Sequence, residues 1–524
     1  MPARRDDSKP ETVQQWTREL DETGIVRLAQ LLALKLGAGD VLALTGDLGA
    51  GKTTLARALI AAFVDEGSGE VPSPTFSLAQ SYATPRLSIS HFDFYRLTSA
   101  EDARELGFEE AAEKGAVIVE WPERAVGLLP DTRYEVELAE TADPGVRRAT
   151  LRGLSGTGPN VARIGEVMAF LDGQPHWRDA AIRHLQGDAS TRSYARLTRD
   201  GETALLMDAP HRPDGPPVRD GKPYSRIARL ADDDMLRPFV AIGGALSASG
   251  LSVPEVIAMD LQKGLALVED LGDLALGPAT AAGFDQAEMW RTAVDVLIHL
   301  RGVPMPAALP LPDGTAYSLP RRDRAAFEIE IDLLLDWYWP AAHGSPAPEQ
   351  VRSEFNALWS PVLDRLLALP GGWFLRDYHS PNLFWLPHRQ GLARMGIIDF
   401  QDALNEHFAF DLVSLLQDAR VTVPEELEAR LFAYYCAEIA RREPSFDREA
   451  FARAYADFGA QRNTRLLGLW MRLLKRDGKP QYLQHIPRTW GYLARNLRSP
   501  GLAGLQAWYD RHFPPEARAA KLPG

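Results

Sequence analysis

The stretch Gly46-Asp47-Leu48-Gly49-Ala50-Gly51-Lys52-Thr53-Thr54 decides the fold of the first part of this 524-residue chain. The apolar run Val41–Leu44 precedes it, and apolar residues at helical spacing follow it over 54–63. A strand, a glycine-rich loop and a helix in this order are the context that a phosphate-binding loop requires. The glycines let successive backbone N–H groups point at a polyphosphate, and the helix directs its positive end at the same anion. The sequence therefore predicts a nucleotide site in an α/β sheet.

Two side chains of this loop have distinct expected roles. Lys52 would reach the outer phosphates of the nucleotide, and the hydroxyl of Thr53 would hold a magnesium ion. The residues of this loop that we expect to bind nucleotide are Gly46, Gly49, Gly51, Lys52, Thr53 and Thr54.

The composition is that of an ordinary globular protein, with 45% hydrophobic and 25% charged residues. The length suggests about three folding units. The net charge of −13 disfavours broad nonspecific binding of nucleic acid, and the single cysteine, Cys436, cannot form an internal disulfide. No apolar run reaches ~18 residues, and the charged start, Met1–Pro10, has no signal-like apolar core. These features predict a cytoplasmic enzyme without a membrane span.

The hydrophobic pattern predicts four consecutive parts. Residues 1–150 alternate short strands and helices, and a linker is expected over 151–163, within a segment rich in Gly, Thr and Pro. Residues 164–275 form a second α/β region, and residues 276–524 are mostly helical. The expected strands are Val41–Thr45, Leu87–Tyr95, Val117–Trp121, Tyr134–Leu138, Tyr194–Thr198, Thr203–Asp208, Leu265–Glu269, Asn382–Leu386 and Met395–Phe400.

Three further residues are expected to converge on the first loop. Thr75, in Ser-Pro-Thr-Phe at 73–76, lies in a loop that could sense the outer phosphate, with a plain turn as the alternative. Asp93 and Glu120 each end an expected strand, in His-Phe-Asp-Phe-Tyr-Arg and Val-Glu-Trp-Pro-Glu. Carboxylates at the carboxyl ends of neighbouring strands face one crevice, where they can hold Mg²⁺ directly or through water. Either acid taken alone would more often be a solvated surface residue.

Together these motifs, over about the first 150 residues, resemble the TsaE (YjeE) family, the ATPase subunits of the bacterial machinery that makes threonylcarbamoyladenosine in tRNA. The resemblance implies a P-loop sheet with mixed strand directions, ATP hydrolysis with Mg²⁺, and partnership with TsaB and TsaD. It implies phosphate and metal binding by Lys52 and Thr53, and a switch-like loop at Thr75. Asp93 would be the metal-side acid, and Glu120 a further metal-binding or catalytic, water-positioning acid. The ATPase would drive or reset a complex, with tRNA contact indirect at most.

A second constellation begins at Asp377 in Leu-Arg-Asp-Tyr-His-Ser-Pro-Asn at 375–382, which contains Asp-x-x-x-x-Asn. In phosphoryl transfer to an alcohol, Asp377 would accept the proton of the attacking hydroxyl. Asn382 and Asp399 would hold Mg²⁺ against the ATP phosphates. An apolar hairpin over 383–398 would bring these two metal ligands together, and His379 could touch the transferred phosphate.

Upstream segments agree with this hypothesis. Ser190, in Gly-Asp-Ala-Ser-Thr-Arg-Ser-Tyr at 187–194, precedes a strand, where a phosphate-covering hairpin belongs. Backbone groups from Glu269 to Leu271 could bond adenine at a hinge after an apolar strand. Each segment taken alone would more often be an ordinary turn or strand.

From about 165 to 510 the chain resembles the aminoglycoside phosphotransferase superfamily, and within it the AmgK-type kinases of N-acetylmuramate and N-acetylglucosamine. The resemblance implies a bilobal protein-kinase-like α+β fold and transfer of phosphate from ATP to the anomeric hydroxyl of an amino sugar. Two departures stand out: Leu375 replaces the usual His, and Met207 stands where protein kinases place a phosphate-pairing Lys. Arg192 or Arg196 is a candidate for the missing cation.

The remaining features have plain interpretations. Asp411, in Phe-Asp-Leu-Val at 410–413, is expected to position the metal loop. The arginine-rich segments 462–476 and 488–498 are expected to be faces of amphipathic helices, with an RNA-binding patch as the alternative.

The sequence thus favours a bifunctional enzyme that combines a TsaE-like ATPase with an amino-sugar kinase of cell-wall recycling. Two alternatives stay open: the second region could be a non-catalytic docking module, or it could phosphorylate antibiotics. A docking module would not need Asp377, Asn382 and Asp399 together.

Two separate ATP sites give a direct prediction. Calorimetric titration of the full chain with Mg²⁺ and a nonhydrolysable ATP analogue should give two nucleotide equivalents, and Lys52→Ala should remove one of them because it deletes the phosphate-reaching ammonium of the first site. A single equivalent in the unchanged protein would contradict the two-site hypothesis.

Overall fold

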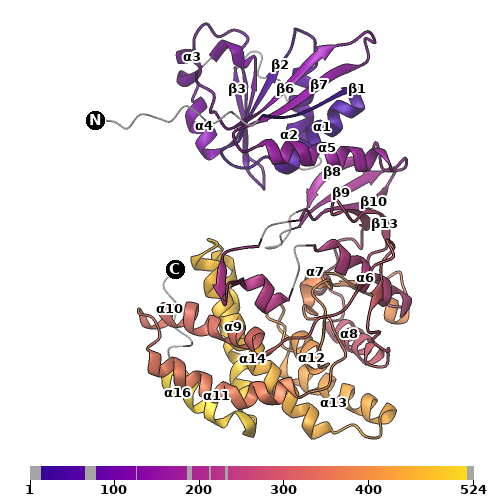
Figure 1. Ribbon diagram of the computed structural model, residues 1–524, viewed down its shortest axis with the longest axis vertical. Helices are drawn as coiled ribbons and strands as arrows, with labels where there is room; N and C mark the ends of the chain where they lie inside the picture. The colour runs from indigo at the N-terminus through magenta and orange to yellow at the C-terminus, as the bar shows by residue number, and fades with distance from the viewer. Residues whose placement is uncertain are drawn as a thin grey trace. The chain divides into compact units, whose positions relative to one another are not determined.

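The computed structural model describes residues 13–64, 78–125, 127–185, 192–211, 214–230, 234–515 and 518, and it divides the chain into two compact units (Figure 1). Unit 1 comprises Met1–Pro210 together with Ile257–Asp270, and unit 2 comprises His211–Val256 together with Leu271–Gly524.

Unit 1 contains two sheets and five helices among its described residues. Its elements are β1 (Gln14–Leu20), α1 (Glu22–Lys35), β2 (Val41–Thr45), α2 (Lys52–Ala61), β3 (Ala79–Tyr82), β4 (Ser88–Asp93), α3 (Ala100–Glu105), α4 (Phe108–Lys114), β5 (Gly115–Glu120), η1 (Pro122–Ala125), β6 (Arg133–Glu140), β7 (Arg147–Leu154), α5 (Gly158–Asp172), β8 (Ala181–Leu185), β9 (Ser193–Arg199), β10 (Glu202–Asp208), β13 (Val256–Asp260) and β14 (Leu265–Glu269).

The first sheet has seven strands in the order β1-β7-β6-β2-β5-β4-β3. Strand β2 pairs in parallel with β5 and β6, and β5 pairs in parallel with β4, whereas the outer strands pair antiparallel. Central strands of parallel sheets are buried on both faces, which explains the unbroken apolar sequence of β2. The mixed α/β sheet that the sequence predicts is confirmed.

Helices cover both faces of this sheet. Helices α1, α2 and α5 pack on one face, with Leu28, Leu59 and Ile164 in the same buried cluster, and α3 and α4 contribute Ala103 and Phe108 to a cluster on the other. Helix α1 starts sharply because the Asp21 side chain accepts a hydrogen bond from the N–H of Gly24. The phosphate loop, which connects β2 to α2, lies at the carboxyl end of the parallel strands.

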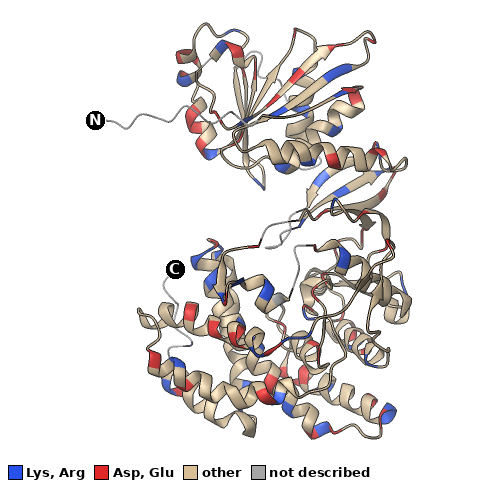
Figure 2. Ribbon diagram, viewed as in Figure 1, with Lys and Arg blue, Asp and Glu red and all other residues tan. Residues whose placement is uncertain are grey.

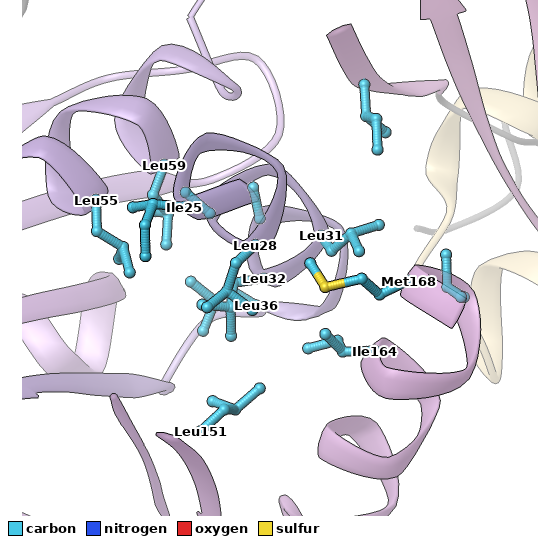
Figure 3. Close-up of a cluster of buried hydrophobic side chains, with 14 of the residues drawn as sticks. Ile25, Leu28, Leu31, Leu32, Leu36, Leu55, Leu59, Leu151, Ile164 and Met168 are labelled. Carbon is cyan, nitrogen blue, oxygen red and sulfur yellow. The ribbon is translucent and has the colours of Figure 1, made fainter. Parts of the chain in front are cut away.

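The second sheet is antiparallel, with five strands in the order β13-β14-β10-β9-β8. Because Leu206 faces Ala195 on one neighbouring strand and Leu267 on the other, these side chains share one face. All three belong to the same buried cluster as Leu28 of α1 and Met168 of α5. Figure 3 shows the α1, α2, β7 and α5 side of this cluster. One apolar core therefore joins the second sheet to the helices that cover the first.

Polar contacts reinforce this joint. The ammonium of Lys35, at the end of α1, lies 2.6 Å from the Asp208 carboxylate on β10, and Arg163 of α5 donates to the other oxygen of Asp208 at 2.8 Å. The side-chain oxygen of Gln30 accepts the N–H of Ile182 on β8. Helix α1 thus contacts two strands of the second sheet directly.

The structure differs from the sequence prediction over 151–163, where a linker was expected. This segment holds the end of β7 and the start of α5, and no unit boundary falls there. Gly153 serves close packing, because a Cβ at this position would lie 2.8 Å from the backbone N of Gly158; just beyond the segment, a Cβ on Gly165 would lie 2.7 Å from the Trp16 ring. A composition that is typical of linkers here reflects tight contact between a strand and a helix.

Unit 2 is mostly helical, as the sequence predicts, and includes four small two-stranded sheets among its described residues. Its elements are β11 (Pro217–Arg219), β12 (Lys222–Pro223), η2 (Ser225–Arg229), α6 (Leu236–Ala248), α7 (Leu276–Ala281), α8 (Gln286–Arg301), β15 (Leu309–Pro310), β16 (Ala316–Tyr317), α9 (Arg324–Leu333), η3 (Leu334–Tyr338), α10 (Trp339–His343), α11 (Glu349–Leu367), β17 (Trp373–Phe374), η4 (Ser380–Asn382), β18 (Leu383–Trp385), η5 (Gly391–Arg394), β19 (Met395–Ile397), β20 (Leu404–Asn405), α12 (Ala409–Leu416), α13 (Glu425–Arg442), α14 (Arg448–Lys475), η6 (Pro480–His485), α15 (Ile486–Leu497), η7 (Pro500–Leu502) and α16 (Ala503–His512).

Helix α14 is the centre of unit 2. It packs against α9, α12, α15 and η3. The approach to α9 is close, because a Cβ on Gly468 would lie 2.2 Å from the backbone of Leu333. Cys436, which the sequence predicts to be a buried small side chain, is free and buried in α13. Among the described helices, none combines the length and hydropathy needed to cross a bilayer.

The shared core of unit 1 predicts that its two sheets lose stability together. We expect Leu28→Ala to lower the free energy of unfolding by about 2–5 kcal/mol, because Leu28 is fully buried and removal of its side chain leaves a cavity. Hydrogen exchange should then speed up in β9 and β10 as well as in α1 and β2. Ile257→Ala, at a half-exposed position of the same unit, serves as the control. Faster exchange confined to the first sheet would show that the two sheets have separate cores.

Candidate functional site

The first site is built on a loop that only glycine can form. Gly46 has φ 135°, and a Cβ at this position would lie 2.3 Å from the carbonyl oxygen of Leu138. Gly49 and Gly51 also have positive φ, 86° and 103°. The loop therefore turns tightly into α2, whose first amides have no side-chain cap.

Lys52 lies folded over this loop. Its ammonium donates to the carbonyl oxygens of Gly46 and Asp47 at 2.6 and 2.9 Å, and it sits 3.7 Å from the centre of the Trp121 ring. Burial lowers the pKa of Lys52, and the nearby carboxylates, Glu120 foremost, oppose that shift. The lysine is held at the place where a phosphate on the loop amides would meet it.

Acidic and hydroxyl groups gather beside the lysine. The Thr53 hydroxyl donates to Oε2 of Glu120 at 2.9 Å, and Nε2 of His91 lies 3.0 Å from Oε1 of the same carboxylate. Asp93 and Glu120 are register partners at the ends of the parallel strands β4 and β5, and both are buried. The structure thus brings together the two acids and the hydroxyl that the sequence singles out.

This set of oxygen atoms fits Mg²⁺, which binds proteins through one or two carboxylates together with substrate phosphates. Within the part of the chain that the structure describes, no group of three His, Cys, Asp or Glu side chains could hold a metal by itself. A Mg²⁺ ion held here would complete its octahedral coordination with nucleotide oxygens and water.

Two residues of this site were not assigned roles from the sequence. His91 is fully buried and orients Glu120, and Trp121 has φ 59° and places its ring over Lys52. Both stand inside the quoted motifs, but only the pairing of β4 with β5 reveals what they contact. Thr75 of the first site and Ser190 of the second lie outside the described residues.

The second site is built on the segment from Leu375 to Asn382 in unit 2. The buried carboxylate of Asp411, on α12, accepts the N–H groups of Leu375 and Arg376 at 2.6 and 2.9 Å. Burial raises the pKa of Asp411 to about 8 against the opposing effect of these two bonds. Arg376 has φ 70°, and its guanidinium is buried against the carbonyl of Ala228 and the carboxylate of Glu330. Asp411 thus fixes the backbone immediately before Asp377, so the loop that it positions is the catalytic loop and not the metal loop expected from the sequence.

Asn382 joins the two acids of this site. Its side-chain amide donates to the backbone carbonyl of Asp377 at 2.9 Å and lies 3.4 Å from Oδ2 of Asp399. The hairpin of β18 and β19 pairs Leu383 with Ile397, so Asn382 and Asp399 lie side by side. The other carboxylate oxygen of Asp399 accepts a bond from Gln401 at 3.0 Å. The predicted hairpin therefore unites Asp377, Asn382 and Asp399, and the oxygens of Asn382 and Asp399 suit Mg²⁺.

One ring nitrogen of His379 contacts the backbone of the catalytic loop. Its Nδ1 lies 2.9 Å from the carbonyl of Asp377, and burial lowers the pKa of the imidazole. A neutral ring that donates from Nδ1 presents an acceptor at Nε2, which cannot donate to a phosphate oxygen. This geometry favours a positioning role over the phosphate contact expected from the sequence.

The hinge and cation candidates lie on or next to strands β9, β10 and β14 in the sequence. Glu269 ends β14 opposite Ala204, and Leu271 begins the next segment of unit 2. Met207, which stands where protein kinases place a lysine, accepts a hydrogen bond from the Tyr194 hydroxyl. Arg196 is held by Asp270 at 2.6 Å, whereas Arg192 is buried near the Tyr194 ring.

Two families match successive parts of the chain. A family profile described as "Threonylcarbamoyl adenosine biosynthesis protein TsaE" matches residues 20–149, and one described as "Phosphotransferase enzyme family" matches residues 181–450. N-acetylmuramate/N-acetylglucosamine kinase of Caulobacter vibrioides is 40% identical over 348 residues, which cover 65% of this chain and 94% of that protein. The TsaE proteins of Rickettsia felis and Rickettsia prowazekii are 46% and 44% identical over 112 and 110 residues, which cover 21% of this chain and 65% and 76% of those proteins.

The contact of Asp411 with the backbone predicts a kinetic effect. We expect Asp411→Asn to lower kcat of the second site by about 10-fold or more, because an amide N–H₂ would face a buried backbone N–H and displace Asp377. Nucleotide binding at the first site, measured by calorimetry, should not change. Asp447→Asn is the matched control, since Asp447 caps α14 and Asn caps equally well. Equal losses in the two variants would argue against this role.

Proposed function

The chain belongs to the phosphotransferase enzyme family and, over its first part, to the TsaE family, and from this premise we propose that it is a bifunctional enzyme. The first part would be the ATPase of the tRNA threonylcarbamoyladenosine machinery, and the second an ATP-dependent kinase of N-acetylmuramate and N-acetylglucosamine in cell-wall recycling. The observation that best supports the kinase function is that one side-chain amide, that of Asn382, contacts both the backbone carbonyl of Asp377 and the carboxylate of Asp399.

In the kinase, Asp377 would accept the proton of the attacking hydroxyl. Its backbone carbonyl is fixed from two sides, by Asn382 and by His379, which orients the carboxylate for this transfer. Asn382 and Asp399 would hold Mg²⁺, which neutralises the charge of the ATP phosphates when bound. Gln401 keeps Asp399 in place.

The acceptor is proposed from the amino-sugar kinase of Caulobacter vibrioides, and its anomeric hydroxyl is the proposed attacking group. The charges near the base support an uncharged or acidic acceptor, because Arg462 and Arg465 both interact electrostatically with Asp377. A polycationic antibiotic would be repelled by these arginines. An acidic or neutral sugar is the better match.

In the first part, the loop amides and Lys52 would bind the phosphates of ATP. Thr53, Asp93 and Glu120 would hold Mg²⁺ or position the attacking water, with His91 orienting Glu120. The proposed partners are TsaB-like and TsaD-like proteins, and tRNA contact would be indirect at most. We place both activities in the cytoplasm.

The kinase is tested by ADP release from the full chain with each of the two amino sugars. Asp377→Asn should lower sugar-dependent ADP release by about 10²-fold or more, because the general base is lost. Lys52→Ala should leave that rate unchanged while it abolishes sugar-independent ATP hydrolysis. Absence of sugar-dependent ADP release by the unchanged protein would refute the kinase, and loss of both activities in Lys52→Ala would refute their independence.

A further inference from the structure

Arginines form one face of α14 that extends away from the catalytic loop. Arg462, Arg465, Arg472 and Arg476 are spaced by 3, 7 and 4 residues, a pattern that keeps side chains on one side of a helix. Arg465 and Arg472 lie two turns apart, about 10 Å along the axis. Figure 2 shows basic segments toward the C-terminal end of this helix.

The start of this face adjoins the base of the proposed kinase. Asp377 interacts electrostatically with both Arg462 and Arg465. Arg462 is buried and already donates to the carbonyl of Gln417, so it has a structural contact. Arg465 keeps 18% of its side chain exposed and is the arginine that a bound acceptor can reach.

The carboxylate nearest Arg465 is already used by other cations. Glu330 is fully buried, pairs with Arg322 and Arg376 at 3.0 and 3.2 Å, and accepts a bond from Gln461 at 2.8 Å. Arg465 approaches the same carboxylate only to 3.7 Å. Arg465 therefore shares this carboxylate with two other arginines.

Arg472 is still less balanced by acids. Its guanidinium lies 4.7 Å from the centre of the Tyr224 ring, and its Nε has no hydrogen-bond partner among the described residues. The Tyr224 side chain also hydrogen-bonds to Arg472, and Arg465 and Arg476 are nearby cations that act on it electrostatically. Asp477 also interacts with Arg472 but is held by Arg476 at 2.7 and 3.0 Å. Half-buried cations without a close acid are costly unless an anion joins them.

We infer that Arg465 and Arg472 form the subsite that binds the carboxylate of an acidic acceptor sugar, and that they set the preference for N-acetylmuramate over N-acetylglucosamine. The inference rests on the proposed kinase function. N-acetylmuramate carries a lactyl group with a carboxylate, and N-acetylglucosamine has no such group. One guanidinium contact with this carboxylate therefore distinguishes the two sugars. Tyr224, which directly precedes η2 and whose ring lies beside Arg472, would contact the same carboxylate.

An RNA-binding patch is the alternative use of this face. Two observations favour the sugar: the face begins at the catalytic base, and Arg465 is mostly buried. Phosphate backbones are bound by exposed arginines along an open surface.

The test compares the two sugars in one protein, so the fraction of folded enzyme cancels. In Arg465→Met and Arg472→Met, the ratio of kcat/KM for N-acetylmuramate to kcat/KM for N-acetylglucosamine should fall by about 10- to 100-fold, mainly through KM for N-acetylmuramate, because loss of a charge that acts on Asp377 affects both sugars alike. Arg465→Lys should restore part of the preference. Arg448→Met, at an exposed arginine in the first turn of the same helix, should change neither value. Added salt should raise KM for the acidic sugar only.

Three other outcomes would contradict the proposed subsite. If the unchanged protein phosphorylates both sugars and the ratio of their kcat/KM values is the same in the variants, the subsite is wrong and the kinase stands. If the variants lose binding of tRNA, measured by filter retention, while that ratio is unchanged, the face is an RNA patch. If the unchanged protein phosphorylates neither sugar, the proposed kinase fails and the subsite fails with it.

Discussion

One buried carboxylate sets the geometry of the kinase-like site. Asp411 binds the N–H groups of two consecutive residues, Leu375 and Arg376, and these bonds hold Arg376 in a left-handed conformation that a non-glycine residue adopts only under constraint. The bend directs Arg376 into the interior and leaves Asp377 at the surface of the loop. Leu375 stands where a histidine was expected from the family resemblance, and Asp411 holds its backbone N–H.

The same loop is tied to α14 through a charge network. Glu330 gathers Arg322 and Arg376 in the interior, and Arg322 also forms a two-bond pair with Glu406. Burying such a network is costly unless every charge is paired, so its members are fixed relative to one another. Arg465 of α14 approaches the same Glu330 carboxylate to 3.7 Å, and Arg472 lies two turns beyond it.

In unit 1, burial of α1 against two sheets makes one folding unit of parts that the two family matches assign separately. The apolar side of α1 packs under the P-loop sheet, and its end binds β10 through Lys35 and Asp208. A single core implies that the strands after residue 181 do not fold independently of the helix at residues 22–35. The physical linkage between the two regions that the families match begins at this helix.

The sequence by itself determined the features that are local in the chain. Gly46 to Thr54 specify their loop because glycine conformations and the adjoining strand and helix are encoded within 14 consecutive positions, 41–54. Asn382 and Asp399 could be paired because a short apolar hairpin connects them. Only the tertiary structure decided which distant groups meet: His91 with Glu120, Trp121 with Lys52, Asp411 with the catalytic loop, and Gly153 with a tightly packed neighbour where a linker was expected. These contacts depend on how strands and helices far apart in the chain pack, and composition does not distinguish a glycine that permits close packing from one that permits flexibility.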